Sequence, residues 1–188
     1  MITAEEIKRS LDRLIAAIAP PTQALGLESN NLPENLPGLP LDLLAYIDVY
    51  GSGFFENGGM FLTVLNPYEK DYWKKQNTDL DLVRQFKAQE GDGYVPYAVW
   101  PDQSGLLLWG YGENRKHFFW LTEGDPGAWP VIVMYDLEIF TRFDMPMLPF
   151  LEKLLCGDLD CGFIGGVDDP GNRVNPASLK FVPSILPS

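Results

Sequence analysis

The feature that most constrains the fold is residues 95–143, where short apolar runs alternate with tight turns. Turn-forming sequences at 102–105, 112–115 and 124–127 separate runs rich in aromatic and β-branched residues, which favour strands. Four of the five tryptophans of the chain lie in this stretch. It holds one histidine, no cysteine and no phosphate-binding glycine loop, so its composition favours a binding scaffold over a catalytic site.

The same alternation predicts a single, mainly antiparallel, twisted sheet of about five to six strands. The strands predicted at 106–111 and 131–135 begin with runs that are apolar on both alternating faces. We therefore expect these two strands to be central and covered on both sides. The other predicted strands are 60–65, 118–122, 139–143 and a weaker one at 97–100.

Helices are predicted to flank this sheet, which makes the fold class α+β. The first helix, at residues 4–18, begins with a capping box formed by Thr3 and Glu6. The second begins at Pro40 and ends at Gly51 and the glycine that follows it at 53.

Two further helices are predicted later in the chain. One covers residues 68–90 and is expected to break near 77–79, where Asp79 would cap its second half. The last covers residues 147–155 and has a stripe of leucines with which to pack on the sheet.

The length and composition fit one domain with a sizeable core, because 46% of the 188 residues are hydrophobic and 13% are aromatic. We predict this domain at residues 1–157, with its core at about 36–155 and the helix 4–18 before it. After Gly157 the apolar pattern fades, and residues 158–188 are predicted to form a Gly- and Pro-rich tail outside the domain.

The net charge of −12 is concentrated in two segments. Residues 14–69 contain six acidic residues and no lysine or arginine, and residues 117–169 contain ten acidic residues against Arg142 and Lys153. Such a distribution repels nucleic acid and anionic membranes and would steer a basic partner into contact. The alternative is that the acidic surface only keeps the protein soluble.

Sequence signals for export, membrane insertion and metal binding are missing. The longest apolar runs are too short to span a membrane, and charged residues interrupt the N-terminal helix, which argues against a signal peptide. We therefore expect a cytoplasmic protein in which Cys156 and Cys161 are reduced thiols. We expect no cofactor and no metal: the cysteines lack a second pair, and the acidic pairs at 158/160 and 168/169 lack the ligand spacing of a calcium loop.

Several short motifs follow one another along the middle of the chain. They are LPLDLLAYI at 39–47 leading into YGSG at 50–53, then LLLWG at 106–110, FFWLT at 118–122, WPVIV at 129–133 and the helix that contains Phe150 and Leu151. In this order and spacing they resemble the SUKH superfamily, which includes yeast cell-wall synthesis regulators and many bacterial immunity proteins. The resemblance covers about residues 36–155, and the two ends of the chain lie outside it.

The resemblance implies a non-enzymatic α+β binding domain whose bacterial members typically neutralise a cognate polymorphic toxin, often a nuclease or a deaminase. Motif residues such as Pro40, Gly51, Trp109 and Trp120 are then scaffold, and the family supplies no catalytic residues. We expect a basic toxin domain as the partner of a monomer or weak dimer that binds neither nucleic acid nor a membrane. The alternative is a regulatory or scaffolding module of the same family that binds a host protein.

The candidate partner-binding residues are acidic residues at predicted turns. They are Glu56 in the turn after the second helix, and Glu123, Asp125, Asp136 and Glu138 on turns that flank the central strands. Their carboxylates would pair with lysines and arginines that the toxin otherwise uses on nucleic acid. Such complementarity raises the association rate and selects the partner, while buried aromatic anchors would supply much of the remaining affinity.

Three further features have both a functional and a structural interpretation. His117 could belong to a catalytic triad, but its place at the start of a strand favours a half-exposed structural residue. The Gly51–Gly53 segment lacks the third glycine and the lysine of a phosphate loop, and it fits a helix end. Trp109 and Trp120 could line a sugar cleft beside a pair of catalytic carboxylates, but we expect them in the core, whereas Trp73 is expected to be partly exposed.

Overall fold

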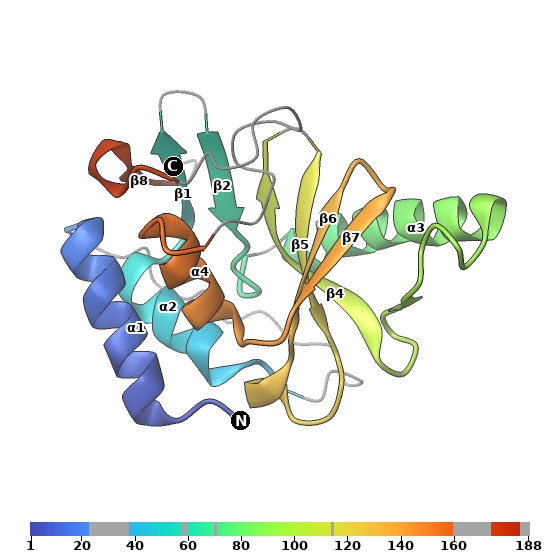
Figure 1. Cartoon of the computed structure of the whole chain (residues 1–188), viewed down its shortest axis with the longest axis horizontal. Coiled ribbons are helices and arrows are strands. Elements are labelled where there is room, and N and C mark those ends of the chain that lie inside the picture. The colour runs from blue at the N-terminus through green and yellow to red at the C-terminus, as the bar shows by residue number, and fades with distance from the viewer. Residues whose placement is uncertain (23–37, 58–59, 70, 114, 160–173, 185–188) are drawn as a thin grey trace.

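The computed structural model describes residues 1–22, 38–57, 60–69, 71–113, 115–159 and 174–184, and eight strands in it form one sheet (Figure 1). The strands are β1 (Gly53–Asn57), β2 (Met60–Val64), β3 (Ala98–Val99), β4 (Gly105–Gly112), β5 (Lys116–Leu121), β6 (Val131–Tyr135), β7 (Ile139–Phe143) and β8 (Lys180–Pro183). Their spatial order is β7-β6-β5-β4-β2-β1-β8, with β3 beside β4. Every pair of neighbours is antiparallel except β3 and β4. The α+β class and the mainly antiparallel sheet are confirmed, with more strands than expected.

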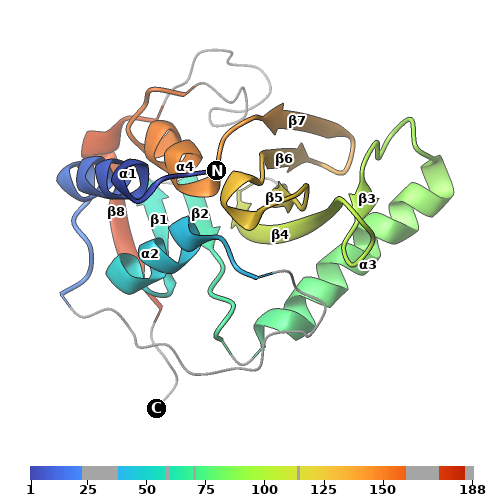
Figure 2. The ribbon, with the colours of Figure 1, turned by 90° about the horizontal axis from the view of Figure 1, so that it is seen from below.

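The helices lie in two groups (Figure 2). The first group consists of α1 (Ala4–Ala17), α2 (Leu41–Tyr50) and α4 (Met147–Leu155), which pack against one another, whereas α3 (Tyr72–Glu90) lies apart from them along β4 and β3. Side chains of β5 alternate between the two groups, as successive residues of a strand must. Phe118 lies 6.1 Å, between ring centroids, from Phe150 of α4, while its neighbour His117 contacts Tyr111, whose hydroxyl donates to Asp79 of α3. The core therefore has one layer on each face of the sheet.

The two strands predicted to be central are confirmed as such. β4 and β6 each have a neighbour on both sides, and residues 106–109 and 131–134 are fully buried. Because both faces of these strands are covered, an apolar residue is favoured at every position.

The first two helices begin as predicted, and they end at Ala17 and at Tyr50. Thr3 accepts a hydrogen bond from the amide of Glu6 at 3.2 Å, and the carboxylate of Glu6 accepts one from the amide of Thr3 at 2.8 Å. Leu14 is fully buried on the inner stripe of α1. Gly51 ends α2 with a φ of 66°, a conformation that glycine adopts without strain.

α3 is one continuous helix, so the predicted break near residues 77–79 is wrong. The hydroxyl of Thr78 donates to the carbonyl one turn earlier at 3.1 Å, which is compatible with an unbroken helix. Asp79 does not cap a second half, because its carboxylate accepts the hydrogen bond from Tyr111 of β4. The fully buried Leu80 holds the same turn against the core, and this packing outweighs the weak local propensity.

β4 has a bulge between Leu108 and Gly110, and side chains of α3 form hydrogen bonds with its backbone there. The carbonyl of Leu108 accepts hydrogen bonds from the hydroxyl of Tyr72 and the side-chain amide of Gln76, both at 3.0 Å. A bulge leaves backbone groups outside the strand ladder. The two side chains satisfy one of these groups and fix α3 to the sheet.

β8 comes from the segment that was predicted to be a tail outside the domain, and β1, with which it pairs, was not predicted at all. Phe55 of β1 lies opposite Phe181 of β8. A Cβ atom at Gly53 would lie 2.3 Å from the ring of Phe181, so this glycine permits the close approach of β8 rather than ending α2. The domain therefore includes residues 180–183, whereas 160–173 lie outside the described residues.

Candidate functional site

The five acidic residues predicted to bind a partner lie at three separate places. Glu123 and Asp125 follow β5, whereas Asp136 and Glu138 lie in the turn between β6 and β7. In the register of β5 and β6 these two places are at opposite ends of the strand pair, about 17 Å apart by the rise of a strand. Glu56 lies inside β1, so its predicted position in a turn after α2 is wrong. The five residues do not form one cluster.

Three of these carboxylates already have a basic partner. Glu56 Oε2 lies 3.5 Å from Lys180 Nζ, Glu123 Oε2 lies 3.1 Å from Arg142 Nη2, and Asp136 Oδ1 lies 2.8 Å from Arg115 Nη1. All three pairs are accessible to solvent, where an ion pair contributes only about 0–1 kcal/mol, so a partner could replace the basic residue. Asp125 accepts a hydrogen bond from the amide of Gly127 at 2.8 Å. The carboxylate of Glu138 makes no hydrogen bond or ion pair with any described residue.

The turn between β6 and β7 presents acidic and apolar side chains together, and we call residues 136–139 the hairpin tip. The amide of Glu138 donates to the carbonyl three residues earlier at 3.1 Å and closes the turn. Its central residues, Asp136 and Leu137, have φ values of 50° and 66°. Such turns usually carry Asn-Gly, because a side chain like that of leucine is strained there. The turn holds Glu138 and the 44% exposed Ile139 at one end of the sheet.

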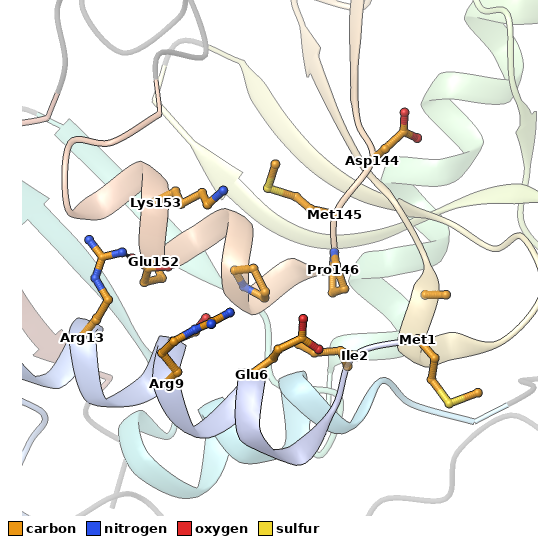
Figure 3. Close-up of a pocket in the computed structure, with 13 residues that line it drawn as sticks. Met1, Ile2, Glu6, Arg9, Arg13, Asp144, Met145, Pro146, Glu152 and Lys153 are labelled. Carbon is orange, nitrogen blue, oxygen red and sulfur yellow. Dashed lines mark ion pairs between the residues drawn. The ribbon is translucent and has the colours of Figure 1, made fainter.

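A cavity of about 570 Å³ lies between α1, α4 and the segment that joins β7 to α4 (Figure 3). This volume is in the range of small-ligand pockets. Its walls combine apolar side chains, such as Ile2, Met145 and Pro149, with charged ones: Glu6, Arg9, Arg13, Asp144, Glu152 and Lys153. None of the five predicted residues lines the cavity.

Glu152 is the acidic residue that sequence reasoning missed. It lies on α4, is only 3% exposed and forms an ion pair of 2.9 Å with Arg13 of α1, which also pairs with Asp158 at 2.6 Å. Burial raises the pKa of Glu152, and the positive charge of Arg13 opposes this shift. A signal existed in the sequence. Glu152 stands four residues after Leu148 and three before Leu155, on the apolar stripe of the predicted helix, where an acidic residue is unexpected.

Asp42 is a second buried carboxylate, and it has a structural role. Its Oδ2 accepts a hydrogen bond at 2.9 Å from the amide of Leu148 in the first turn of α4, and its Oδ1 accepts one at 3.0 Å from the amide of Leu43. Pro146, the N-cap residue of α4, has no side chain that can accept a hydrogen bond, so Asp42 supplies the cap from α2. Burial raises the pKa of Asp42, and the amide hydrogen bonds act in the opposite direction. Asp42 thus fixes α4 and one wall of the cavity.

The aromatic residues and the histidine have the structural surroundings that were expected. Trp109 and Trp120 are 0% and 1% exposed, and Trp73 is partly buried. His117 is half-buried and packs between Tyr111 and Phe119, with ring centroids 5.4 and 6.1 Å away. Burial lowers the pKa of His117, because the charged form of the ring loses solvation there.

The hydrolase interpretation requires a pair of carboxylates and tryptophans around one cleft. Three carboxylates line the cavity, but each has a partner: Glu6 accepts hydrogen bonds from Thr3, Asp144 pairs with Arg142, and Glu152 pairs with Arg13. Among the residues that line this cavity there is no tryptophan. The cavity therefore lacks the sugar-stacking part of that interpretation.

Cys156 is a free thiol, and burial raises its pKa. The remaining cysteine and acidic residues considered as ligands, Cys161, Asp160, Asp168 and Asp169, lie outside the described residues. Within the described ranges, no group of three or more His, Cys, Asp or Glu side chains is placed to hold a metal ion. None of the helices in these ranges combines the length and the apolar character that crossing a membrane requires.

No family model, no curated protein and no solved structure matches this chain. The resemblance to the SUKH superfamily therefore rests on the sequence motifs and stays a prediction, as does the function that it implies.

Proposed function

We propose that this chain is a protein-binding immunity module that neutralises a basic toxin domain by covering its functional surface. The observation that carries the proposal is the hairpin tip. It combines Glu138, whose carboxylate has no partner among the described residues, with the exposed apolar side chain of Ile139. An interface needs both, because charge selects the partner and a buried apolar anchor supplies affinity. The acidic segment 117–169 adds the long-range attraction.

Neutralisation by occlusion requires no chemistry from the bound protein. The carboxylates of Asp136 and Glu138 would pair with lysines and arginines through which the toxin contacts nucleic acid. Asp136 would exchange its ion pair with Arg115 for one with a basic residue of the toxin. Because the Arg115–Asp136 pair is largely exposed, its loss has little effect on stability. Ile139, buried in the partner, would add affinity in proportion to the apolar area removed from water.

The test is a pull-down from the native organism at low and at moderate salt, with the wild-type chain and a Glu138→Lys/Ile139→Asp variant as baits. We expect the wild type to retain a basic protein, to inhibit its nuclease or deaminase activity, and to release it as salt rises. The variant should bind it at least about tenfold more weakly, since it loses an anchor and reverses a charge.

Glu90→Lys is the control for the Glu138→Lys part of the variant, because it reverses the charge of an exposed residue at the end of α3. It should bind and inhibit like the wild type. Full inhibition by the hairpin-tip variant would contradict the proposed surface. Capture of housekeeping proteins alone would contradict immunity and favour the scaffolding alternative.

A further inference from the structure

The charged residues around the cavity between α1 and α4 differ in whether they have a direct hydrogen-bond or ion-pair partner. Its acidic residues have direct partners: Glu6 in the capping box, Asp144 on Arg142 and Glu152 on Arg13. Arg9 and Lys153, in contrast, make no hydrogen bond or ion pair with any residue that the structure describes. Both charges act on Glu152 through space, and that of Arg9 also acts on Glu6. In a chain of net charge −12, this cavity therefore presents two cations without a direct partner.

These two cations belong to different walls of the cavity. Arg9 extends from α1 toward α4, whereas Lys153 extends from α4 toward Met145, and the carboxylate of Asp144 points away from the other labelled side chains (Figure 3). A guanidinium group binds both oxygens of a carboxylate, and an ammonium group adds a mobile point charge. A ligand carboxylate that reaches both walls would satisfy both cations.

On its buried side, the cavity also favours a ligand that donates a hydrogen bond. Arg13 Nη1 lies 2.9 Å from Oε1 of Glu152 as an ion pair, but its angle leaves this buried oxygen without a hydrogen bond from any described residue. A buried acceptor in this state is stabilised by a new donor, and an N–H group of a ligand reaches it once the half-exposed side chain of Arg13 moves aside. Met145 and Pro149 offer apolar surface beside it.

We propose that this cavity binds the C-terminal residue of a peptide. Its carboxylate lies between Arg9 and Lys153, its amide N–H donates to Glu152, and its apolar side chain packs on Met145 and Pro149. The volume of about 570 Å³ accommodates one such residue. This inference does not rest on the immunity proposal, which uses the hairpin tip, so the failure of one leaves the other standing.

The experiment titrates the isotope-labelled full chain with three small probes and follows the backbone amide signals by NMR. N-acetyl-L-leucine carries the carboxylate and the N–H, N-acetyl-L-leucinamide lacks the charge, and 4-methylpentanoate lacks the N–H. We expect N-acetyl-L-leucine to shift the amides of α1 and α4 around the cavity, with a Kd of about 1 mM for a ligand of about a dozen heavy atoms. The other two probes should bind at least about fivefold more weakly.

Variants test the two cations separately. Arg9→Met and Lys153→Met remove exposed side chains, so both variants should fold, and each should weaken N-acetyl-L-leucine about tenfold by loss of a charge-assisted hydrogen bond. Lys8→Met is the matched control, since it removes the same charge from the neighbouring position of α1, where Lys8 pairs with Asp12 and does not line the cavity. It should leave the Kd unchanged.

Three outcomes would overturn the proposal. The first is that the amides around the cavity do not shift at about 20 mM N-acetyl-L-leucine, a concentration well above the Kd expected for a ligand of this size. The second is equal binding of the uncharged amide, and the third is an equal loss of affinity in Lys8→Met and Arg9→Met. Equal binding of 4-methylpentanoate would overturn the role given to Glu152.

Discussion

The two faces of the sheet are joined to their helices by different kinds of contact. On the face of α4 the contacts are aromatic: the ring of Phe150 lies 6.1 Å from those of Trp109 and Phe118. On the face of α3 a buried polar contact is added to the apolar packing of Leu80, because the side chain of Gln76 donates to the carbonyl of Leu108. Apolar packing depends mainly on the area and volume that are buried, whereas a buried polar contact depends on individual donors and acceptors. The first face should therefore respond to changes in size and the second to changes in chemistry.

The largest effect is expected on the face of α4. Phe150→Ala removes a fully buried ring that contacts Trp109, Phe118 and Phe143, and it should lower the free energy of unfolding by about 3–5 kcal/mol. Phe150→Leu keeps most of the volume and should lower it by only about 1 kcal/mol. Urea denaturation measures both values. Equal losses for the two variants would mean that volume does not dominate this face.

The next effect is expected on the face of α3, where a change of chemistry without a change of size should suffice. Gln76→Glu replaces the donor to Leu108 with a buried carboxylate oxygen, and at neutral pH it should lower the free energy of unfolding by about 2–3 kcal/mol. Gln85→Glu makes the same change at an exposed position of α3 and should stay within about 0.5 kcal/mol of the wild type. If the two variants lose the same stability, the polar contact is not what joins α3 to β4.

A smaller effect concerns pH. Because burial lowers the pKa of His117 below its unfolded value of about 6.5, the unfolded chain takes up a proton more readily than the folded one. The stability that neutral His117 contributes is therefore complete above about pH 6.5 and is lost as the pH falls below it. His117→Phe should gain stability relative to the wild type as the pH falls from about 7 to about 5.

Denaturation midpoints of both proteins at several pH values measure this difference. The raised pKa values of Asp42 and Glu152 act in the opposite direction, but they are common to both proteins and cancel. A difference that does not change with pH would show that His117 does not titrate in this range.

The smallest effect is expected at the hairpin tip, which belongs to neither face. Arg115→Ala breaks a largely exposed ion pair with Asp136 and should change the free energy of unfolding by less than about 0.5 kcal/mol. Thermal unfolding of the variant beside the wild type is a sufficient measurement. A loss above about 1 kcal/mol would mean that Asp136 is not free to exchange its partner and would weaken the proposed mechanism of occlusion.

Elements whose signals lie within their own residues were predictable from the sequence. The capping box at Thr3 and Glu6, the leucine stripe of α4 and the apolar runs of β4 and β6 each follow from a local period or a local hydrogen bond. The buried positions of Trp109 and Trp120 followed from their neighbours in the same strands. These features account for most of the fold class.

Features that depend on distant partners were not predictable in the same way. β1 is a short run between glycines, and it is a strand because β2 and β8 pair with it on both sides. The break expected in α3 does not occur, because the burial of Leu80 and Gln76 against the sheet outweighs a polar stretch. Tertiary contacts decided both cases.

The candidate sites also combine features that the local sequence predicts with features that depend on distant residues. Acidic residues on turns could be located from the sequence, and Asp136 and Glu138 do lie together on one turn. The ion pairs of Glu56, Glu123 and Asp136 could not be foreseen, because their partners Lys180, Arg142 and Arg115 come from other parts of the chain. The cavity needs α1 and α4, which lie at opposite ends of the domain in sequence, so no local pattern could reveal it.

The pairing of β8 with β1 has a consequence for the chain during its synthesis. Phe181 of β8 lies 5.2 Å from Phe55 of β1, yet more than a hundred residues separate the two strands in sequence. At about 5–20 residues per second, β1 leaves the ribosome about 6–25 s before its edge partner. For that interval an open strand edge lies beside an uncovered aromatic ring, which is a template for pairing with other chains. We expect nascent chains of this protein to depend on holdase chaperones until β8 has emerged.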